Sequence, residues 1–107
     1  MREKEATEIY KRAILKYGSS RQVDKTIEEL GELSTALMKF KHGTADMKAV
    51  VTELADVFIM VYQMSIVFGM DDVIDEIQYK TRRLEKKMDD EILRNENLKT
   101  IEYYYGG

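Results

Sequence analysis

Apolar side chains recur at intervals of three and four residues along most of this chain, and glycines interrupt the pattern at three places. Such spacing gathers apolar groups on one face of an α-helix. The interruptions are Gly18, Gly43 and Gly69, and glycine readily adopts the left-handed conformation that ends helices. Alternation typical of strands is nearly absent. The sequence therefore predicts an all-α fold, an antiparallel helical bundle of about four helices.

The expected helices cover approximately residues 3–17, 22–41, 44–68 and 71–94. Their N-termini follow small polar or acidic residues that can cap a helix: Ser19 or Ser20 for the second, Thr44 or Asp46 for the third, and Asp71 or Asp72 for the fourth. The second helix carries an apolar stripe that should face the core, made of Ile27, Leu30, Leu33, Leu37 and Phe40. The tail, residues 96–107, shows no usable period and is expected to pack on a partner subunit or to be mobile.

The segment from Val57 to Phe68 is apolar nearly all round, which is typical of a helix buried on several sides. A membrane span is not expected, because the run is short and contains Gln63 and Ser65. Glu53 and Asp56 also lie directly before it. Four helices of one chain are too few to cover this segment. We therefore expect the bundle to be completed by oligomerisation, as a homodimer or a homotetramer.

Length and composition narrow the class of protein. A chain of 107 residues suits a single domain, residues 1–107, with an N-terminal helix in residues 1–22. A formal net charge of -3 argues against general binding of a nucleic-acid polymer. The chain has no cysteine, which excludes disulfides and thiolate chemistry, and its charged N-terminus lacks the apolar core of a signal peptide. We expect a cytoplasmic protein without membrane contact.

An acidic pair interrupts the apolar face of the second expected helix, in the stretch IEELGEL at residues 27–33. At about 100° per residue, Glu29 lies about 40° from Leu33 on a helical wheel, within the apolar stripe or at its edge. Glu32 follows one turn later on the same side. Glu28 lies further round, where a carboxylate is more readily solvated.

The third expected helix repeats this arrangement in TELADVFIM, residues 52–60, where Glu53 and Asp56 border the apolar face. A short turn near Gly43 joins the two helices. Glu32 lies about ten residues before this turn and Glu53 about ten after it, so their heights match at about 1.5 Å per residue. The two acidic pairs are therefore expected to meet.

Four converging carboxylates, those of Glu29, Glu32, Glu53 and Asp56, would be costly in a partly buried site unless their charge were compensated. A divalent cation removes the conflict. Carboxylates without imidazole or thiolate are hard ligands, which favours Mg²⁺ or Mn²⁺ over zinc. A solvated acidic face is the alternative, and spacing alone leaves both open.

The motif EELGE followed by ELAD resembles the E-E-x-x-E … E-x-x-D signature of the MazG-like all-α nucleoside triphosphate pyrophosphohydrolases. Here the signature reads Glu28-Glu29-x-x-Glu32 and Glu53-x-x-Asp56, and the resemblance extends over about residues 23–87. It implies Mg²⁺-dependent cleavage between the α and β phosphates of a nucleoside triphosphate, with Mn²⁺ as a substitute metal. The products would be the nucleoside monophosphate and pyrophosphate.

The resemblance also implies roles for single residues. The metal-ligand positions fall on Glu29, Glu32, Glu53 and Asp56, and the first glutamate of the motif, Glu28, would orient water or a second metal. Basic residues of the last helix hold phosphates in this family. The candidates here are Lys80 and Arg83, followed by Arg82 and Lys87. Related enzymes prefer dUTP, dCTP or phosphoribosyl-ATP, so the base and sugar stay open.

Other side chains have a packing interpretation beside a functional one. Tyr17, Phe58 and Tyr62 suit stacking on a base, but aromatic residues at helical spacing more often form a core, as do Met60 and Met64. His42, the single histidine, lies beside a glycine and is expected to complement a helix dipole rather than to act in catalysis.

Two other functions compete with the enzyme. One is a non-catalytic helical interaction module whose acidic face binds a basic partner. The other is a ferritin-like di-iron bundle, which would require Glu-x-x-His pairs that this chain lacks.

Overall fold

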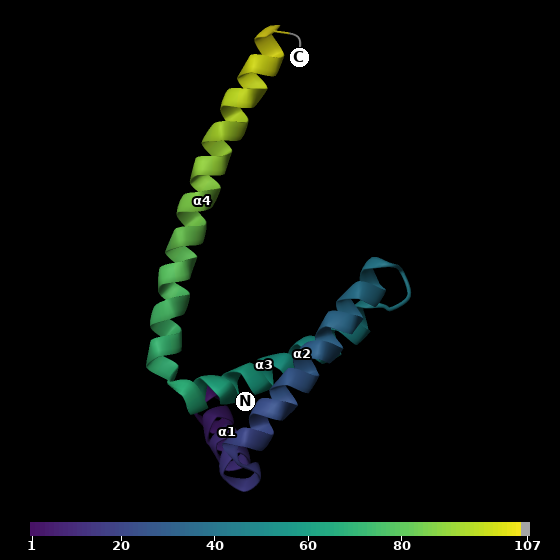
Figure 1. Ribbon diagram of the computed structural model, residues 1–107, viewed down its shortest axis with the longest axis vertical. Coiled ribbons are helices and arrows are strands. Elements are labelled where there is room, and N and C mark those ends of the chain that lie inside the picture. The colour runs from purple at the N-terminus through teal and green to yellow at the C-terminus, as the bar shows by residue number, and fades with distance from the viewer. Residues whose placement is uncertain (106–107) are drawn as a thin grey trace. The chain divides into compact units, whose positions relative to one another are not determined.

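The computed structural model describes the backbone of residues 1–105 and the side chains of residues 1–95. In this described part the chain forms four helices and no strand (Figure 1): α1 (Glu3–Tyr17), α2 (Ser19–Lys41), α3 (Met47–Phe68) and α4 (Met70–Tyr105). The prediction of an all-α fold with four helices is confirmed. The chain divides into two compact units, Met1–Met70 and Asp71–Gly107, and each is described by itself.

The three glycines separate the helices as the sequence predicted. Gly18, Gly43 and Gly69 have φ angles of 88°, 77° and 119°, in the region where a side chain would be strained. The bounds predicted for α1 are confirmed. Asp46 caps α3, because its Oδ1 accepts a hydrogen bond of 2.9 Å from the backbone N–H of Ala49.

Two predicted caps are wrong. Helix α2 already begins at Ser19, directly after Gly18, so neither Ser19 nor Ser20 precedes the helix as a cap. Helix α4 begins at Met70, which places Asp71 and Asp72 inside its first turn, where their charge complements the helix dipole. The helix also continues through residues 96–105, where we expected a separate tail, and the side chains of that stretch lie outside the described residues.

The first unit is built on a hairpin of α2 and α3, which lie side by side along much of their length and run in opposite directions (Figure 1). Helix α1 packs against both. Tyr62 ties α1 to α3, because its hydroxyl lies 2.8 Å from Oγ1 of Thr7 and its ring centroid lies 5.2 Å from that of Tyr10. The packing interpretation of Tyr62 therefore holds in this chain.

The buried face of α2 differs from the predicted apolar stripe. It consists of Gln22, Thr26, Glu29 and Ala36. The stripe residues Ile27, Leu30, Leu37 and Phe40 are instead 46–64% exposed. Within one chain the prediction that this stripe forms the core is wrong, because α3 packs on the polar side of α2.

Helix α3 is also less covered than its composition predicted. Only Met60, Gln63 and Ser65 are buried among its residues, while Phe58 and Phe68 are 72% and 70% exposed. By length and composition α3 could cross a membrane, with a mean hydropathy of 1.6 and 22% of the apolar stretch buried. Burial on several sides therefore requires a surface that this chain alone does not provide.

The second unit is the single helix α4. Its described apolar residues recur at three- and four-residue spacing and are exposed: Ile74, Ile77, Leu84 and Met88. Its basic side chains make local contacts. Arg82 pairs with Glu85 at 3.3 Å, and the Arg83 guanidinium lies 5.9 Å from the Tyr79 ring centroid.

Candidate functional site

Glu29 is a buried carboxylate on the face of α2 that packs against α3, and only 6% of the residue is exposed. Its position follows from helical periodicity, since Gln22, Thr26 and Ala36 share the same face. The helical wheel placed Glu29 within the apolar stripe or at its edge; the structure buries Glu29, but on a face shared with Gln22, Thr26 and Ala36 rather than with that stripe. A charged side chain at such a depth requires a compensating positive charge or hydrogen bonds, because burying it without a partner costs on the order of several kcal/mol.

Two other carboxylates approach Glu29 from α3. Glu53 and Asp56 are half-buried, and one oxygen of each lies within 4.8 Å of the other and of a Glu29 oxygen. They lie three residues apart on one helix, which places both on the side that faces α2. The two acidic motifs of the sequence therefore meet across the hairpin.

Two carboxylate oxygens of this group lack a hydrogen-bond partner within the described part of the chain. Oε2 of Glu29 and Oε2 of Glu53 are both enclosed and have no hydrogen-bond partner among the described residues. Buried carboxylate oxygens are normally paired, so two such atoms in one group suit a bound cation. Three carboxylates suit Mg²⁺ or Mn²⁺ by hardness. The residues present therefore fit a divalent metal ion.

A second acidic group shares Glu29 and lies closer to solvent. Glu28 and Glu32 are exposed, and one oxygen of each lies within 4.8 Å of the other and of Glu29. The charge of Glu29 is the largest cause that raises the pKa of Glu32, followed by desolvation and the charge of Glu53. Glu32 therefore belongs to the group with Glu28 and Glu29, and the charge of Glu53 on α3 also acts on it.

Lys25 supplies the positive charge that the chain itself places at the site. Its Nζ lies 3.0 Å from Oε1 of Glu29 and 3.6 Å from Oε1 of Glu28. The hydrogen bond to Glu29 is the largest cause that raises the pKa of Lys25, followed by the charge of Glu28. Lys25 was not among the predicted site residues, although its spacing of three and four residues before Glu28 and Glu29 is the signal that marks it.

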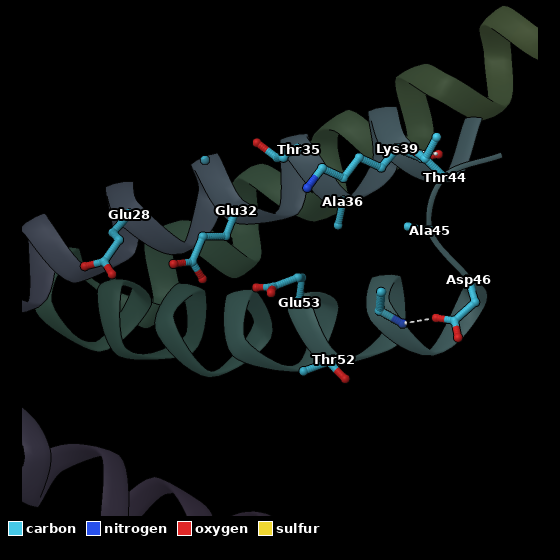
Figure 2. A pocket seen from close by; sticks show the side chains of 12 residues that line it. Glu28, Glu32, Thr35, Ala36, Lys39, Thr44, Ala45, Asp46, Thr52 and Glu53 are labelled. Carbon is cyan, nitrogen blue, oxygen red and sulfur yellow. Dashed lines mark hydrogen bonds between the residues drawn. The ribbon is translucent and has the colours of Figure 1, made fainter. Parts of the chain in front are cut away.

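A groove of about 960 Å³ runs from these acids along the α2–α3 hairpin to the turn that joins the helices (Figure 2). Glu32 on α2 and Glu53 on α3 point toward one another across it. At the other end the wall contains Thr35, Lys39 and Thr44. Figure 2 shows the Lys39 amine reaching back along the groove toward Thr35, so one cation and several hydroxyls follow the acids.

Lys39 was not among the predicted site residues. It is the single Lys or Arg among the described residues that line this groove. The signal that could have found it is its distance of seven residues from Glu32, which is two turns on the same face of α2. Its position suits an anion that extends from the metal site.

The phosphate-binding candidates Lys80 and Arg83 lie on α4, in the second unit, and their role stays a prediction. His42 occupies the C-cap position of α2, as expected of a residue that complements the dipole. Of the two other stacking candidates, Phe58 is 72% exposed, whereas Tyr17 lines a second cavity beside the acids.

The comparison with family models gives one match, the MazG nucleotide pyrophosphohydrolase domain, over residues 18–88. Neither the curated proteins nor the solved structures contain a match to this chain. The matched segment covers more than half of the chain and contains both acidic motifs. It agrees with the buried carboxylate group described above, and the chain belongs to the MazG nucleotide pyrophosphohydrolase family.

Proposed function

We propose that this protein is a Mg²⁺-dependent nucleoside triphosphate pyrophosphohydrolase, which cleaves a (d)NTP between the α and β phosphates. Water adds at one phosphorus of the α–β bridge, the bridging P–O bond breaks, and the products are a (d)NMP and pyrophosphate. The observation that carries the proposal is the pair of enclosed, unpartnered oxygens of Glu29 and Glu53. These atoms lie in a three-carboxylate group at the end of a groove of about 960 Å³, which leaves space for a phosphate chain.

The metal ligands in this proposal are Glu29, Glu53 and Asp56, with Glu32 completing the set from the solvent side. A divalent cation bound there would neutralise phosphate charge and lower the pKa of a bound water. Mn²⁺ would be accepted for the same reason of ligand hardness. Lys25 fixes one oxygen of Glu29 and so leaves the other free for the metal.

The groove beyond the acids suits the phosphates distant from the metal. Lys39 would pair with a phosphate oxygen, and the hydroxyl of Thr35 would donate to another. Glu28, which lies beside Glu29 and also borders this groove, is the candidate for orienting the attacking water. Lys80, Arg83 and the further basic residues of α4 remain candidates for phosphate contacts from the second unit.

A panel of NTPs and dNTPs, including dUTP, with Mg²⁺ or Mn²⁺ and detection of pyrophosphate tests the proposal. Wild-type protein should release pyrophosphate, and Glu53→Gln should reduce kcat/KM by at least about a thousandfold if it removes a metal ligand that acts in the transition state. Glu8→Gln is the matched control, because Glu8 is exposed on α1 and pairs only with Lys11 at 3.8 Å. No cleavage of any nucleotide would favour the interaction module with an acidic face.

The proposed working form is a homo-oligomer, a dimer or a tetramer. Leu30 and Leu54 lie about 100° from Glu29 and Glu53 on their helical wheels, in the same rotational sense. Because the two helices run antiparallel with the acids facing each other, equal rotations bring both apolar stripes to one side of the hairpin. The exposed members of this shared face are Ile27, Leu30, Leu37, Met47, Val51, Leu54, Phe58 and Val61.

A second copy of the chain would bury this face, because contiguous exposed apolar surface marks interfaces between subunits. Light scattering on purified protein should give an oligomer, and Phe58→Glu should dissociate or precipitate it. Leu15→Glu, at an exposed apolar position on α1 outside this face, is the control and should leave the mass unchanged. A stable wild-type monomer, or recovery in the membrane fraction, would contradict the proposal of a cytoplasmic oligomer.

A further inference from the structure

A pair of buried glutamines joins α2 to α3 two helical turns from the acids. Nε2 of Gln22 donates to Oε1 of Gln63 at 2.6 Å, and the two residues are only 6% and 4% exposed. Gln63 is the only residue with an amide side chain in α3, whose other residues around it are apolar. Burying an amide group costs free energy unless its hydrogen bonds are made, so the pair requires an explanation.

One hydrogen bond uses only part of what the two amides offer. Each amide carries two N–H donors and a carbonyl acceptor. Among the described residues, the carbonyl oxygen of Gln22 and the amide nitrogen of Gln63 have no partner. Among the described side chains, the enclosed atoms without a partner are Oε2 of Glu29 and Oε2 of Glu53, and neither amide atom is one of them. The pair thus presents a free acceptor and a free donor side by side.

Both glutamines line a cavity of about 580 Å³ whose wall comes from α1, α2 and α3. Gln22 and Gln63 line this cavity together with Lys25 and Glu28, which belong to the acidic site. Glu28 borders both this cavity and the groove of Figure 2. The cavity is therefore continuous with the acids on the side opposite to Lys39.

The two glutamines lie at the same axial distance from the proposed metal ligands, one on each helix. Gln22 precedes Glu29 by seven residues and Gln63 follows Asp56 by seven, which is about 10 Å along each helix axis and only about 20° of rotation. A nucleotide has a comparable span from the edge of its base to its α-phosphate. A base in the cavity would thus leave the α–β bridge near the acids.

The wall of the cavity offers a surface for the flat side of a base. The Arg21 guanidinium lies 5.1 Å from the ring centroid of Tyr17, and both residues line the cavity. Aromatic rings and guanidinium planes are surfaces on which bases stack. The cavity therefore combines a stacking wall with an inner hydrogen-bonding pair.

We infer that Gln22 and Gln63 read the edge of the substrate base and set the nucleotide preference of this enzyme. The inference rests on the proposed function for its phosphate chemistry, but the base contact itself needs no hydrolysis. Every base edge carries donors and acceptors in its own order, so a fixed pair of amides favours one order over the others. A site built to hydrogen-bond a group discriminates strongly against a molecule that leaves its buried polar atoms unpaired.

Gln63→Met tests the inference, because methionine keeps the length of the side chain and removes its amide. Two readouts are measured: kcat/KM for each NTP and dNTP, and the calorimetric affinity for each nucleoside monophosphate and for pyrophosphate. We expect the ratio between the best and the next base to fall by about tenfold or more, which corresponds to about 1.4 kcal/mol. The affinity for pyrophosphate should stay unchanged.

Thr26→Val is the control for a merely structural role. Thr26 is 8% exposed and donates to the backbone oxygen of Gln22 at 2.7 Å, but it does not line the cavity. It should lower the stability of the fold and keep the base preference. If Gln63→Met fails to fold by circular dichroism, Gln22→Met removes the same pair from the other helix.

The outcomes separate the inference from the proposed function. A wild-type protein that hydrolyses all bases equally, or a Gln63→Met protein with unchanged preference, overturns the inference and leaves the hydrolase intact. Absence of hydrolysis together with a base preference in monophosphate binding that Gln63→Met abolishes overturns the proposed hydrolase and supports the base-reading pair.

Discussion

Replacing Glu53 by glutamine should stabilise the metal-free protein and at the same time remove the stabilisation that Mg²⁺ gives. In the folded chain, carboxylate oxygens of Glu29, Glu53 and Asp56 all lie within 4.8 Å of one another. At that separation two unit charges repel by about 3.5 kcal/mol if the effective dielectric constant is about 20. Solvent and the nearby Lys25 screen part of this repulsion, so we expect a net gain of about 1 kcal/mol in the free energy of unfolding.

Magnesium should reverse the order of stability. A ligand that binds only the folded state stabilises it by about 2.7 kcal/mol when its concentration is one hundred times its Kd. Wild-type protein should gain this amount, whereas Glu53→Gln, which lacks one of the charged ligands, should gain much less. Urea unfolding followed by circular dichroism, in EDTA and in Mg²⁺ at one protein concentration, measures both effects.

The control for this experiment is again Glu8→Gln, which should match wild type in both conditions, because its surface ion pair contributes little. A Glu53→Gln protein that is less stable than wild type in EDTA and responds equally to Mg²⁺ would refute the reasoning. The enclosed oxygens would then be stabilised by something other than a cation.

Three further predictions concern pH, the groove and the helix packing. The pKa of Glu32 is raised, so its contribution to the stability of the metal-free fold is fully present below its unfolded pKa and is lost as pH rises through its folded pKa. Protons should therefore compete with Mg²⁺ for Glu32 at a higher pH than for an ordinary glutamate. In calorimetric titrations of Mg²⁺ at several pH values, Glu32→Gln should flatten this dependence. Lys39→Ala should raise KM for a triphosphate by about tenfold, because one charge-assisted hydrogen bond to the substrate is lost. The affinity for the monophosphate, measured by its inhibition of the same reaction, should stay unchanged. Tyr62→Phe should lower the free energy of unfolding by about 1 kcal/mol, because the 2.8 Å hydrogen bond with Thr7 is lost, and kcat/KM should stay unchanged. A tenfold fall in kcat/KM, which corresponds to about 1.4 kcal/mol, would instead place Tyr62 in the site.

Much of the fold could be predicted because the signals are local. Helix bounds depend on propensity, on periodicity and on glycines with positive φ, and these predicted α1 within its observed bounds and the ends of α2 and α3. The errors occurred where two local signals compete. Ser19 can cap a helix or begin one, and Gly18 decided for the latter by taking the cap position.

The site could be predicted in part for the same reason. Spacing of three residues placed Glu53 and Asp56 on one face. The wheel placed Glu29 within or beside the apolar stripe, whereas the structure buries it on the neighbouring face of α2. The ion pairs of Lys25 also follow from spacing within one helix, although they were not predicted. Partners that come from different helices are harder, since the Gln22–Gln63 bond joins positions 41 residues apart.

The sequence by itself determined that this chain forms four helices and that two of them carry acids at matching heights. Only the tertiary structure decided which side of α2 faces α3. Helical periodicity ranks the faces of one helix by hydrophobicity, and on α2 the more apolar face is the exposed one in this chain. Which residues of α2 are buried depends on how its surface fits that of α3, and this fit buries Gln22, Thr26 and Glu29. The same packing encloses the carboxylate group and leaves an apolar face open for a further subunit.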